Sequence, residues 1–388
     1  MKSLLRHCLL SSMLMLFATT LALGQAAEGA SKVLQESAGK HPSLAVGSKA
    51  IDFNLTGIDG KKYSLASFKS SKILVIAWTS NHCPTAQAYE DRLMKFTSDY
   101  SKKGVAVVAI MPNDPKSVSL SELGYTDYGD SYQEMQWRAK DKGFNFPYLY
   151  DGDTEVTSKA YGPIATPHIM IFDKDRVLRY SGRFDDVENP KKTPTTHDAI
   201  NATEDLLAGR PVAVPTTKVF GCSTKWAEKA DWRARDEAKW ATEVVTLNDL
   251  DDAVLTDLKA NPGTKLRLIN IWSSTSKASV DQFTQFTDMH RMYRRRPWEL
   301  INISLDDLAK RDEVSAILKQ KYAGSTQNYI ISDKAKLMAA IDPNWNGTTP
   351  YTLLVEPGGK VLYAKPGPIN QIEIKKLIAD SPTVGRYF

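Results

Sequence analysis

Residues 72–85 read KILVIAWTSNHCPT, and this stretch decides the fold. The apolar run that ends at Trp78 is typical of a strand buried on both faces of a sheet. A polar turn follows, and Cys83-Pro84 then opens an amphipathic stretch that continues to Tyr100. Because proline is favoured in the first turn of a helix, the sequence predicts a strand, a turn and a helix with Cys83 at the helix N-terminus.

The rest of this half alternates between predicted strands and helices. The predicted elements are a buried strand at 105–111, a helix from Ser131 that opens with a Ser131–Glu134 capping box, two strands at 169–173 and 177–182, and a closing helix at 198–208. Upstream, Asp59-Gly60 predicts a tight turn between short extended segments. This order of elements is typical of an α/β architecture, in which helices cover a central sheet.

The second half of the chain repeats this plan. Residues 266–272 read LRLINIW and match the strand that ends at Trp78, again with a polar turn and an amphipathic stretch after it. Thr349-Pro350-Tyr351 precedes a strand pair broken at Gly358-Gly359, as Thr166-Pro167-His168 precedes the earlier pair. We therefore predict two copies of one α/β domain with inserts of different lengths.

Composition supports a globular protein of two domains and excludes several other classes. The chain has 388 residues, of which 42% are hydrophobic and 24% charged. At about 150 residues per domain, this length suggests two domains. The net charge of +5 is too small to indicate nucleic-acid binding, and the only long apolar stretch lies at the N-terminus, which excludes a multi-pass membrane protein. The densest basic cluster, Arg294-Arg295-Arg296, is interpreted as a solvated helix end.

The N-terminus is typical of an export signal. Lys2 and Arg6 precede an apolar stretch at 8–23, and small residues follow near position 24. The apolar stretch has about 16 residues, fewer than the roughly 20 of a membrane-spanning helix, and a retained anchor is the alternative. We therefore expect a signal peptide at 1–24, a flexible segment at 25–43, and a periplasmic or extracellular protein.

The remaining chain divides into two domains and a connector. The predicted limits are 44–223 for the first α/β domain, 224–240 for the connector and 241–388 for the second domain. The connector is rich in charged residues, which favours a helix exposed to solvent, and it holds Trp226, Trp232 and Trp240. We expect these tryptophans to pack on one or both domains.

Two cysteines remain once the signal peptide is removed, Cys83 and Cys222. In an oxidising compartment such a pair is a structural disulfide, a redox pair or two separate thiols. The histidines are scattered, no Cys/His cluster has the spacing of a zinc site, and no glycine-rich phosphate-binding motif occurs. We therefore predict neither a metal nor a cofactor.

Several ordered segments resemble the thioredoxin fold, and more closely its peroxiredoxin-like branch, the redoxins related to alkyl hydroperoxide reductase and thiol-specific antioxidant proteins. The resembling segments are Ser80–Pro84, Tyr89–Arg92, Asp130–Gly143, Phe146–Asp151, Thr166-Pro167, Asp173, Tyr180–Gly182 with Asp185-Asp186, and Gly221–Ser223 with Lys225-Trp226. The resemblance implies central mixed β-sheets flanked by helices, a cis peptide bond before Pro167 that faces the active cysteine, and Cys222 as a second, returning cysteine. The second copy resembles a thioredoxin-like domain in general, with a cis bond expected before Pro350.

Two departures from these relatives limit the chemistry that the resemblance implies. Many relatives carry a cysteine at the position of Ser80, so a dithiol cycle within a Cys-x-x-Cys motif is excluded here. Peroxiredoxins carry Thr or Ser at that position, as this chain does, but they usually have a proline where this chain has Ile76. In the second copy, Ser276 and Ser279 fill the positions of a Cys-x-x-Cys pair. The second domain is therefore predicted to be degenerate and to lack thiol chemistry.

Cys83 is the strongest candidate for a catalytic residue. At a helix N-terminus, free backbone N–H groups and the helix dipole lower the pKa of a thiol from about 8.5 to about 3.5–7.5. Ser80 either hydrogen-bonds the thiolate or a peroxide oxygen, or it caps the helix. His82 either stabilises the thiolate as a cation or points to solvent. Pro167 joins the site through the resemblance, which places its cis bond opposite the active cysteine.

Peroxiredoxins also use an arginine near the thiolate, and Arg92 and Arg183 are the two candidates for this role. Arg92 comes nine positions after Cys83, which places it on the opposite face of the predicted helix. Arg183 is the other candidate. The sequence does not identify either one as the partner of the thiolate.

These residues predict an exported thiol oxidoreductase. In the favoured mechanism the Cys83 thiolate attacks a peroxide, Cys222 resolves the sulfenic acid as a disulfide, and an external dithiol reduces that disulfide. One alternative is thiol–disulfide exchange on protein substrates. The other is a non-catalytic binding or scaffold protein in which Cys83–Cys222 is a structural disulfide. A protein partner is a further possibility, through the second domain.

Overall fold

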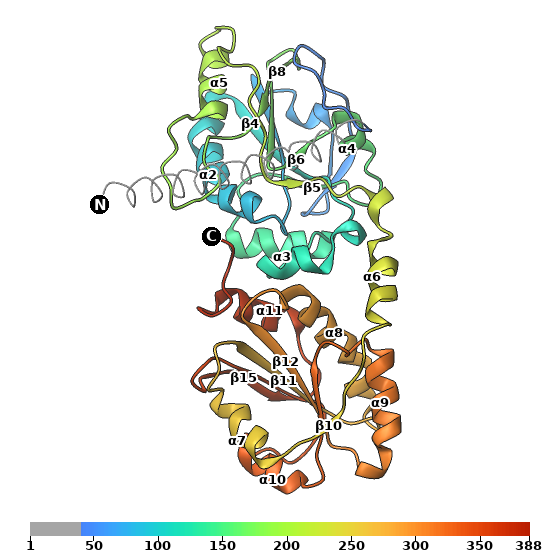
Figure 1. Cartoon of the computed structure of the whole chain (residues 1–388). Helices are drawn as coiled ribbons and strands as arrows, with labels where there is room; N and C mark the ends of the chain where they lie inside the picture. The colour runs from blue at the N-terminus through green and yellow to red at the C-terminus, as the bar shows by residue number, and fades with distance from the viewer. Residues whose placement is uncertain (1–39) are drawn as a thin grey trace, which may run out of the picture.

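The computed structural model describes residues 40–388, which form two α/β units stacked end to end (Figure 1). The predicted signal peptide, its alternative as an anchor, and most of the predicted flexible segment lie outside the described residues. Within 40–388, no helix combines the length and the apolar character needed to cross a membrane.

The first unit is built on a seven-stranded mixed sheet with the order β2-β1-β5-β4-β3-β7-β8. Its strands are β1 (Leu55–Gly57), β2 (Lys62–Tyr63), β3 (Ile73–Trp78), β4 (Val105–Met111), β5 (Tyr148–Tyr150), β7 (His168–Phe172) and β8 (Leu178–Gly182). Its helices are α2 (Pro84–Tyr100), the short 3₁₀ helix η4 (Leu120–Tyr125), α3 (Tyr132–Lys142), α4 (Val156–Tyr161) and α5 (Asp198–Leu207). Strand β3 runs parallel to β4 and antiparallel to β7, so it lies at the centre of the sheet.

Strand β3 is apolar at every position because both faces of the sheet are covered. Val75 packs in a core that includes side chains of α2 and α5. Ile76 and Trp78 point to the opposite face and pack in a second core with Tyr161 of α4. Alternate side chains therefore enter two different cores, and the end of β3 carries the turn to Cys83 into the middle of the unit.

The second unit has a six-stranded mixed sheet with the order β10-β13-β12-β11-β14-β15. Its strands are β10 (Asn248–Asp249), β11 (Leu266–Trp272), β12 (Trp298–Ser304), β13 (Gln327–Ile330), β14 (Tyr351–Val355) and β15 (Val361–Pro366). Its helices are α7 (Asp252–Ala260), α8 (Lys277–Tyr293), α9 (Arg311–Gln320), α10 (Lys334–Ile341) and α11 (Gln371–Asp380). Helix α6 (Trp232–Trp240) runs alongside both units and connects them (Figure 1).

The centre of the second sheet repeats the centre of the first. In each unit a parallel pair, β4-β3 or β12-β11, continues into an antiparallel pair, β7-β8 or β14-β15. The peptide bonds before Pro167 and Pro350 are both cis, as predicted. The predicted fold class, α/β with two tandem thioredoxin-like domains that each have a mixed sheet flanked by helices, is confirmed.

In the first unit, the sequence missed the shortest strands. Strand β5 and a separate two-stranded sheet, formed by β6 (Ala165–Thr166) and β9 (Cys222–Ser223), were not predicted. Strands of two or three residues cannot show the alternation by which a strand is recognised in a sequence. The β6-β9 pair is the more consequential omission, because it contains one of the two cysteines.

The two units meet where α3 and η4 of the first face α8 and α11 of the second (Figure 1). Gly124 of η4 approaches the backbone of α8 so closely that a Cβ atom built on it would lie 2.3 Å from the carbonyl oxygen of Met292. Beyond α11, the Arg386 guanidinium contacts the Asp127 carboxylate with N–O distances of 3.2 and 3.3 Å. Shape and charge therefore both fit across this interface.

The tryptophans of the connector pack on both units, as expected. Trp226 is buried against His41, with ring centroids 4.6 Å apart. The Trp232 indole donates to the carbonyl oxygen of Lys116 in the first unit at 2.6 Å. Trp240 is buried in a core of the second unit.

The basic cluster at 294–296 is only partly a solvated helix end. It follows α8, and Arg294 and Arg295 are exposed as predicted. Arg296 instead crosses to the first unit, where its guanidinium donates to the carbonyl oxygen of Gly124 at 2.8 Å. The prediction is therefore wrong for Arg296, because a contact between domains leaves no signal in a local charge pattern.

The close approach at Gly124 generates a test of the interface. Gly124→Ala should destabilise the protein by about 1–3 kcal/mol, because the added methyl group overlaps the backbone of α8. The units should also separate more readily, so limited proteolysis should cleave the connector faster. Gly263→Ala is the control, since its added Cβ would find its nearest atom at 3.7 Å. Equal unfolding curves and equal cleavage rates for the two variants would contradict this account.

Candidate functional site

Cys83 lies after the carboxyl end of β3 as the buried N-cap of α2. Pro84 is the first helical residue, and the N–H groups of this first turn have no partners within the helix. The Cys83 Sγ lies 3.0 Å from the carbonyl oxygen of Thr166, the residue that precedes cis Pro167. The backbone N–H of Cys222 donates to the same sulfur, with an N–S distance of 3.3 Å.

Cys222 reaches Cys83 because β9 pairs antiparallel with β6, which sets Cys222 opposite Thr166. Gly221 permits this pairing. Its φ is +133°, which L side chains rarely adopt, and a Cβ atom there would lie 2.2 Å from the carbonyl oxygen of Thr166. Both cysteines are free thiols in this structure. Cys222 thus lies in a strand.

His82 and Asp130 form a buried ion pair beside Cys83. The His82 Nδ1 and the Asp130 Oδ2 are 2.6 Å apart, and the two residues are only 1% and 2% exposed. The Asp130 Oδ1 accepts from the backbone N–H groups of Asn81 and His82, and the Asn113 amide donates to Oδ2 at 2.7 Å. The His82 Nε2 is buried and has no hydrogen-bond partner among the described residues. The alternative that His82 points to solvent is therefore wrong.

The charges and hydrogen bonds around the two cysteines shift their pKa values in opposite directions. Burial lowers the pKa of His82, but the Asp130 carboxylate outweighs burial and raises that pKa above its usual value. Burial raises the pKa of Cys83, but hydrogen bonds from the Cys222 thiol and from the backbone of Ala86 and Cys222, together with the His82 charge, lower it to about 6. The pKa of Cys222 is raised, first by its hydrogen bond to Cys83 and then by burial.

The contact with Thr166 favours the neutral thiol of Cys83, but it does not outweigh the groups that lower the pKa of this cysteine. Only the protonated thiol of Cys83 can donate to the carbonyl oxygen of Thr166. The thiolate loses that hydrogen bond, but it accepts from the backbone N–H of Cys222 and lies next to His82. These groups favour the charged form, and the pKa of Cys83 is lowered on balance.

A cavity of about 460 Å³ opens beside this pair of cysteines. His82, Pro84 and Cys222 of the first unit line it, and so do Arg295 and Arg296 of the second. The cavity therefore touches both neighbours of Cys83 in the sequence, while Cys83 itself is buried behind its wall.

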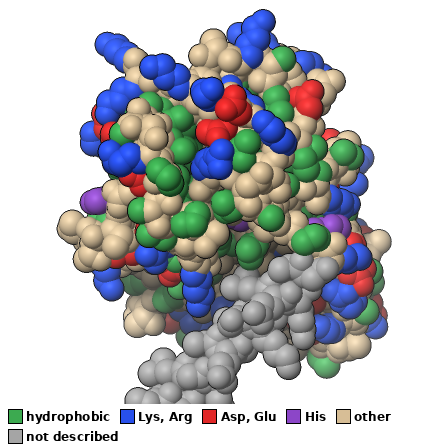
Figure 2. All heavy atoms as spheres, turned by 90° about the horizontal axis from the view of Figure 1, so that it is seen from above, with side chains coloured by type: hydrophobic (Ala, Val, Ile, Leu, Met, Phe, Trp, Pro, Cys, Tyr) green, Lys and Arg blue, Asp and Glu red, His purple; other side chains and the backbone are tan. Residues whose placement is uncertain are grey.

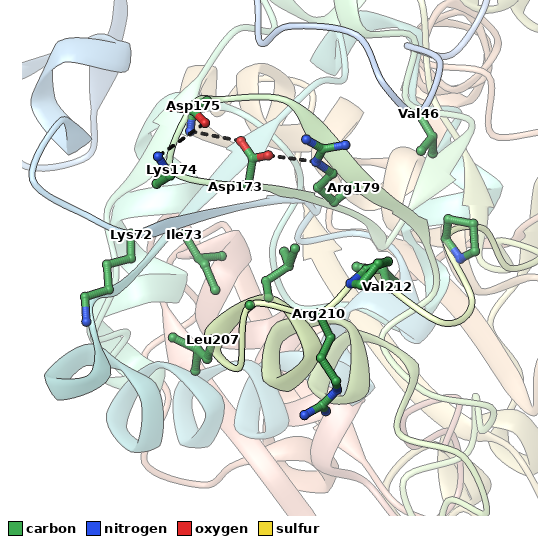
Figure 3. Close-up of a pocket in the computed structure, with 14 residues that line it drawn as sticks. Val46, Lys72, Ile73, Asp173, Lys174, Asp175, Arg179, Leu207, Arg210 and Val212 are labelled. Carbon is green, nitrogen blue, oxygen red and sulfur yellow. Dashed lines mark hydrogen bonds and ion pairs between the residues drawn. The ribbon is translucent and has the colours of Figure 1, made fainter.

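A larger cavity of about 670 Å³ lies at the opposite end of β3 (Figure 3). It is bounded by Ile73, the loop after α5 and the turn between β7 and β8, where Asp173 pairs with Arg179. No cysteine or histidine lines it. Because the larger cavity has neither a cysteine nor a histidine in its lining, the smaller cavity is the candidate active site.

Figure 2 shows the molecule from above, onto the end of the first unit that is remote from the second. Lys and Arg side chains lie beside apolar ones on this face.

Comparison with known proteins places this arrangement in a family. Residues 45–200 match the Redoxin family. A putative peroxiredoxin of Mycobacterium tuberculosis is 30% identical over 129 residues, which cover 32% of this chain and 69% of that protein. This chain belongs to the redoxin family. Thiol-disulfide oxidoreductase ResA of Geobacillus thermodenitrificans is 24% identical over 135 residues, which cover 34% of this chain and 66% of that protein. The chain thus spans about two thirds of the length of these relatives.

Two solved structures are similar to about half of this chain. A hypothetical protein from Sinorhizobium meliloti 1021 is 34% identical and covers 48% of this chain and 96% of its own, with a TM-score of 0.43. An uncharacterized conserved protein from Geobacillus kaustophilus is 36% identical and covers 48% of this chain and 94% of its own, with a TM-score of 0.42. The named curated relatives are thiol-disulfide oxidoreductases and putative peroxiredoxins, and the part of this chain that matches the family is a redoxin domain.

Ser80 and Pro167 of the redoxin domain act on Cys83 through Thr166. The Ser80 Oγ hydrogen-bonds the Thr166 Oγ1 at 2.8 Å, and the N-cap of α2 is Cys83 itself. The alternative that Ser80 caps the helix is therefore wrong. Pro167 follows Thr166 directly and, with Ala86 of α2, borders one small buried void. Both residues hold the strand segment whose carbonyl group contacts the sulfur.

The arginines of the redoxin domain considered from the sequence do not approach the thiolate. Arg92 lies on the far side of α2, as expected, and pairs with Asp185 at 2.5 Å. Arg183 pairs with Asp198 at 2.7 Å. The guanidinium groups at the cavity come instead from the second unit, and sequence reasoning had not connected them to the site.

The second unit keeps the geometry of the cap without the sulfur. Ser276 is the N-cap of α8, and its Oγ donates to the carbonyl oxygen of Thr349 at 3.1 Å, as the Cys83 thiol faces Thr166. Counted from these caps, Ser276 corresponds to Cys83 and Ser279 to Ala86 of the redoxin domain, so the prediction that Ser276 and Ser279 fill the two positions of a Cys-x-x-Cys pair is wrong for Ser279. Residues 40–388 contain no group of three or more His, Cys, Asp or Glu side chains arranged to hold a metal ion.

The close approach of Gly221 to Thr166 generates a test of how Cys222 is positioned. Gly221→Ala should slow formation of the Cys83–Cys222 disulfide by diamide about tenfold or more, because the methyl group forces β9 away from β6 by a displacement that costs about 1–3 kcal/mol. Mass spectrometry of quenched samples measures the rate. Gly209→Ala is the matched control: its φ is also positive, at +71°, but no atom lies within 4 Å of the added Cβ. Equal rates for the two variants would contradict the assigned geometry.

Proposed function

We propose that the redoxin domain reduces peroxides, with Cys83 as the nucleophile. The Cys83 thiolate attacks one peroxide oxygen, the O–O bond breaks, and the sulfur becomes a sulfenic acid while the other oxygen leaves as an alkoxide or hydroxide. The imidazolium of His82 gives that oxygen a proton from Nε2, so water or an alcohol departs and His82 becomes neutral. Ser80 and Pro167 keep the Thr166 segment against the sulfur during this step.

In this proposal Cys222 resolves the sulfenic acid. Its sulfur attacks the oxidised Cys83 sulfur, the S–O bond breaks, and water leaves as the Cys83–Cys222 disulfide forms. An external dithiol then supplies two electrons and two protons, which return both cysteines to thiols. The single observation that carries the proposal is the position of Cys83 at the N-terminus of α2, next to the His82–Asp130 ion pair and 3.3 Å from the backbone N–H of Cys222. The pKa of Cys83 is accordingly lowered, whereas that of Cys222 is raised.

Thiol–disulfide exchange on a larger substrate is the second candidate function. The cavity of about 460 Å³ is far larger than a hydrogen peroxide molecule requires, which favours a bulky disulfide or organic peroxide. The same thiolate would then attack a substrate sulfur, and Cys222 would release the mixed disulfide. The name of the relative ResA, a thiol-disulfide oxidoreductase, supports this alternative.

The proposal also covers the setting of the enzyme. It places the protein outside the cytosol, where the signal peptide at 1–24 would direct it and where an external dithiol would serve as reductant. It assigns the redoxin domain to 44–223, the connector to 224–240 and a degenerate thioredoxin-like domain without cysteines to 241–388.

Substitution of each cysteine in turn distinguishes a catalytic pair of cysteines from a structural disulfide. Cys222→Ser should still consume about one equivalent of peroxide and then over-oxidise, because no thiol resolves the sulfenic acid. Cys83→Ser should consume none. Peroxide consumption and the mass of the oxidised protein are the measurements, with thermal melting as a check of folding.

Opposite results would identify a structural disulfide. If both variants lose the same stability and neither changes peroxide consumption, Cys83 is not a nucleophile toward peroxide. If Cys83→Ser abolishes reduction of an aromatic disulfide while peroxide consumption of the parent is negligible, the exchange function replaces the peroxidase function.

A further inference from the structure

The cavity beside Cys83 is not complete within the redoxin domain. One wall comes from the second domain, through Met292 at the end of α8, Arg295 and Arg296 just beyond it, and the aromatic pair Tyr387 and Phe388. Tyr387 also packs edge to face on Tyr125 of the redoxin domain, with ring centroids 5.2 Å apart. A domain without thiols therefore shapes the entrance to the thiol site.

Arg296 has a structural task in this wall. Its guanidinium donates to the carbonyl oxygens of Gly124, at 2.8 Å, and of Val384. It also lies over the ring of Tyr125, with its central carbon 4.6 Å from the ring centroid. These contacts of Arg296 link the two domains, so its guanidinium is already paired.

Arg295 has no such task. It is exposed, and within residues 40–388 it forms no ion pair and no side-chain hydrogen bond. Of the carboxylates that line the cavity from the redoxin domain, Glu122 is paired with Lys225, and Glu188 lies on the loop after β8 without an ion-pair partner in the described part of the chain. The Arg295 guanidinium, on the wall that the second domain supplies, is therefore available to a ligand in the cavity.

We propose that the second domain completes the substrate pocket and that Arg295 binds an acidic group of the substrate. This inference rests on the proposed thiol chemistry of Cys83. The substrate is a disulfide or hydroperoxide that carries a carboxylate, which pairs with Arg295, and an apolar body, which packs on Met292 and the Tyr387 and Phe388 rings. Glu188, which also lines the cavity, disfavours a second negative charge on the same ligand.

Alkylation of Cys83 tests Arg295 without any need for turnover. The probes are iodoacetate and iodoacetamide, which transfer similar groups to the thiolate and differ in charge. Mass spectrometry locates the adduct on Cys83 and gives a rate for each probe. Arg295→Ala should lower the iodoacetate-to-iodoacetamide rate ratio about threefold, and this difference should shrink at about 1 M salt, where charges are screened beyond about 3 Å.

Two further variants complete the experiment. Arg294→Ala removes the same charge one position away but outside the cavity lining, so its ratio should match that of the parent. Glu188→Gln should raise the ratio. Equal ratios for the Arg295→Ala and Arg294→Ala variants would overturn the inference even if peroxide turnover is normal. A lowered ratio in a protein that does not turn over peroxide would support Arg295 and reject the peroxidase function alone.

Discussion

The Asp130 carboxylate is the charge on which the rest of the site depends. Burying a carboxylate costs several kcal/mol of folding free energy unless the group is paired and hydrogen-bonded. Asp130 pairs with the His82 ring and accepts hydrogen bonds from the backbone N–H groups of Asn81 and His82 and from the Asn113 amide. Asn113 in turn accepts from the backbone N–H of Lys225 at 2.9 Å. One side chain therefore fixes the turn before Cys83, the loop after β4 and the segment that follows Cys222, while it keeps an imidazolium next to the sulfur.

The second domain shows which part of this arrangement is scaffold and which part is chemistry. Asp306 holds the turn after β11 through the backbone N–H and the hydroxyl of Ser274, at 2.8 and 2.9 Å, much as Asp130 holds the turn after β3. Ser276 takes the place of the cysteine at the helix cap. The frame of turn, cap and cis proline thus persists without a sulfur or an imidazole, and the structure gives this domain a different part, as one wall of the neighbouring pocket.

Local patterns predicted the frame, and distant contacts account for what the sequence missed. The buried strand that ends at Trp78, the helix that opens at Cys83 and the two proline-led strand pairs have signals within a few residues, and the structure contains them all. Asp130 lies 48 positions from His82, so nothing in the sequence joins them, and the solvent-facing alternative for His82 stayed open. Cys222 is placed at the site by a strand of only two residues, and Arg295 is placed there by the packing of one domain on the other. Neither feature leaves a periodic signal in the sequence.

The most direct test of the account is a pH titration of the Cys83 thiolate by its absorbance near 240 nm, in the parent protein and in Asp130→Asn. The account predicts a midpoint at a pH of about 6 for the parent. In Asp130→Asn the midpoint should move up by about one unit or more, because His82 loses the carboxylate that keeps it charged and the thiolate loses its cation. Reactivity of the parent should accordingly fall about tenfold per unit below this midpoint. A parent midpoint near 8.5, the value of an ordinary cysteine, or an unchanged midpoint in Asp130→Asn would contradict the account.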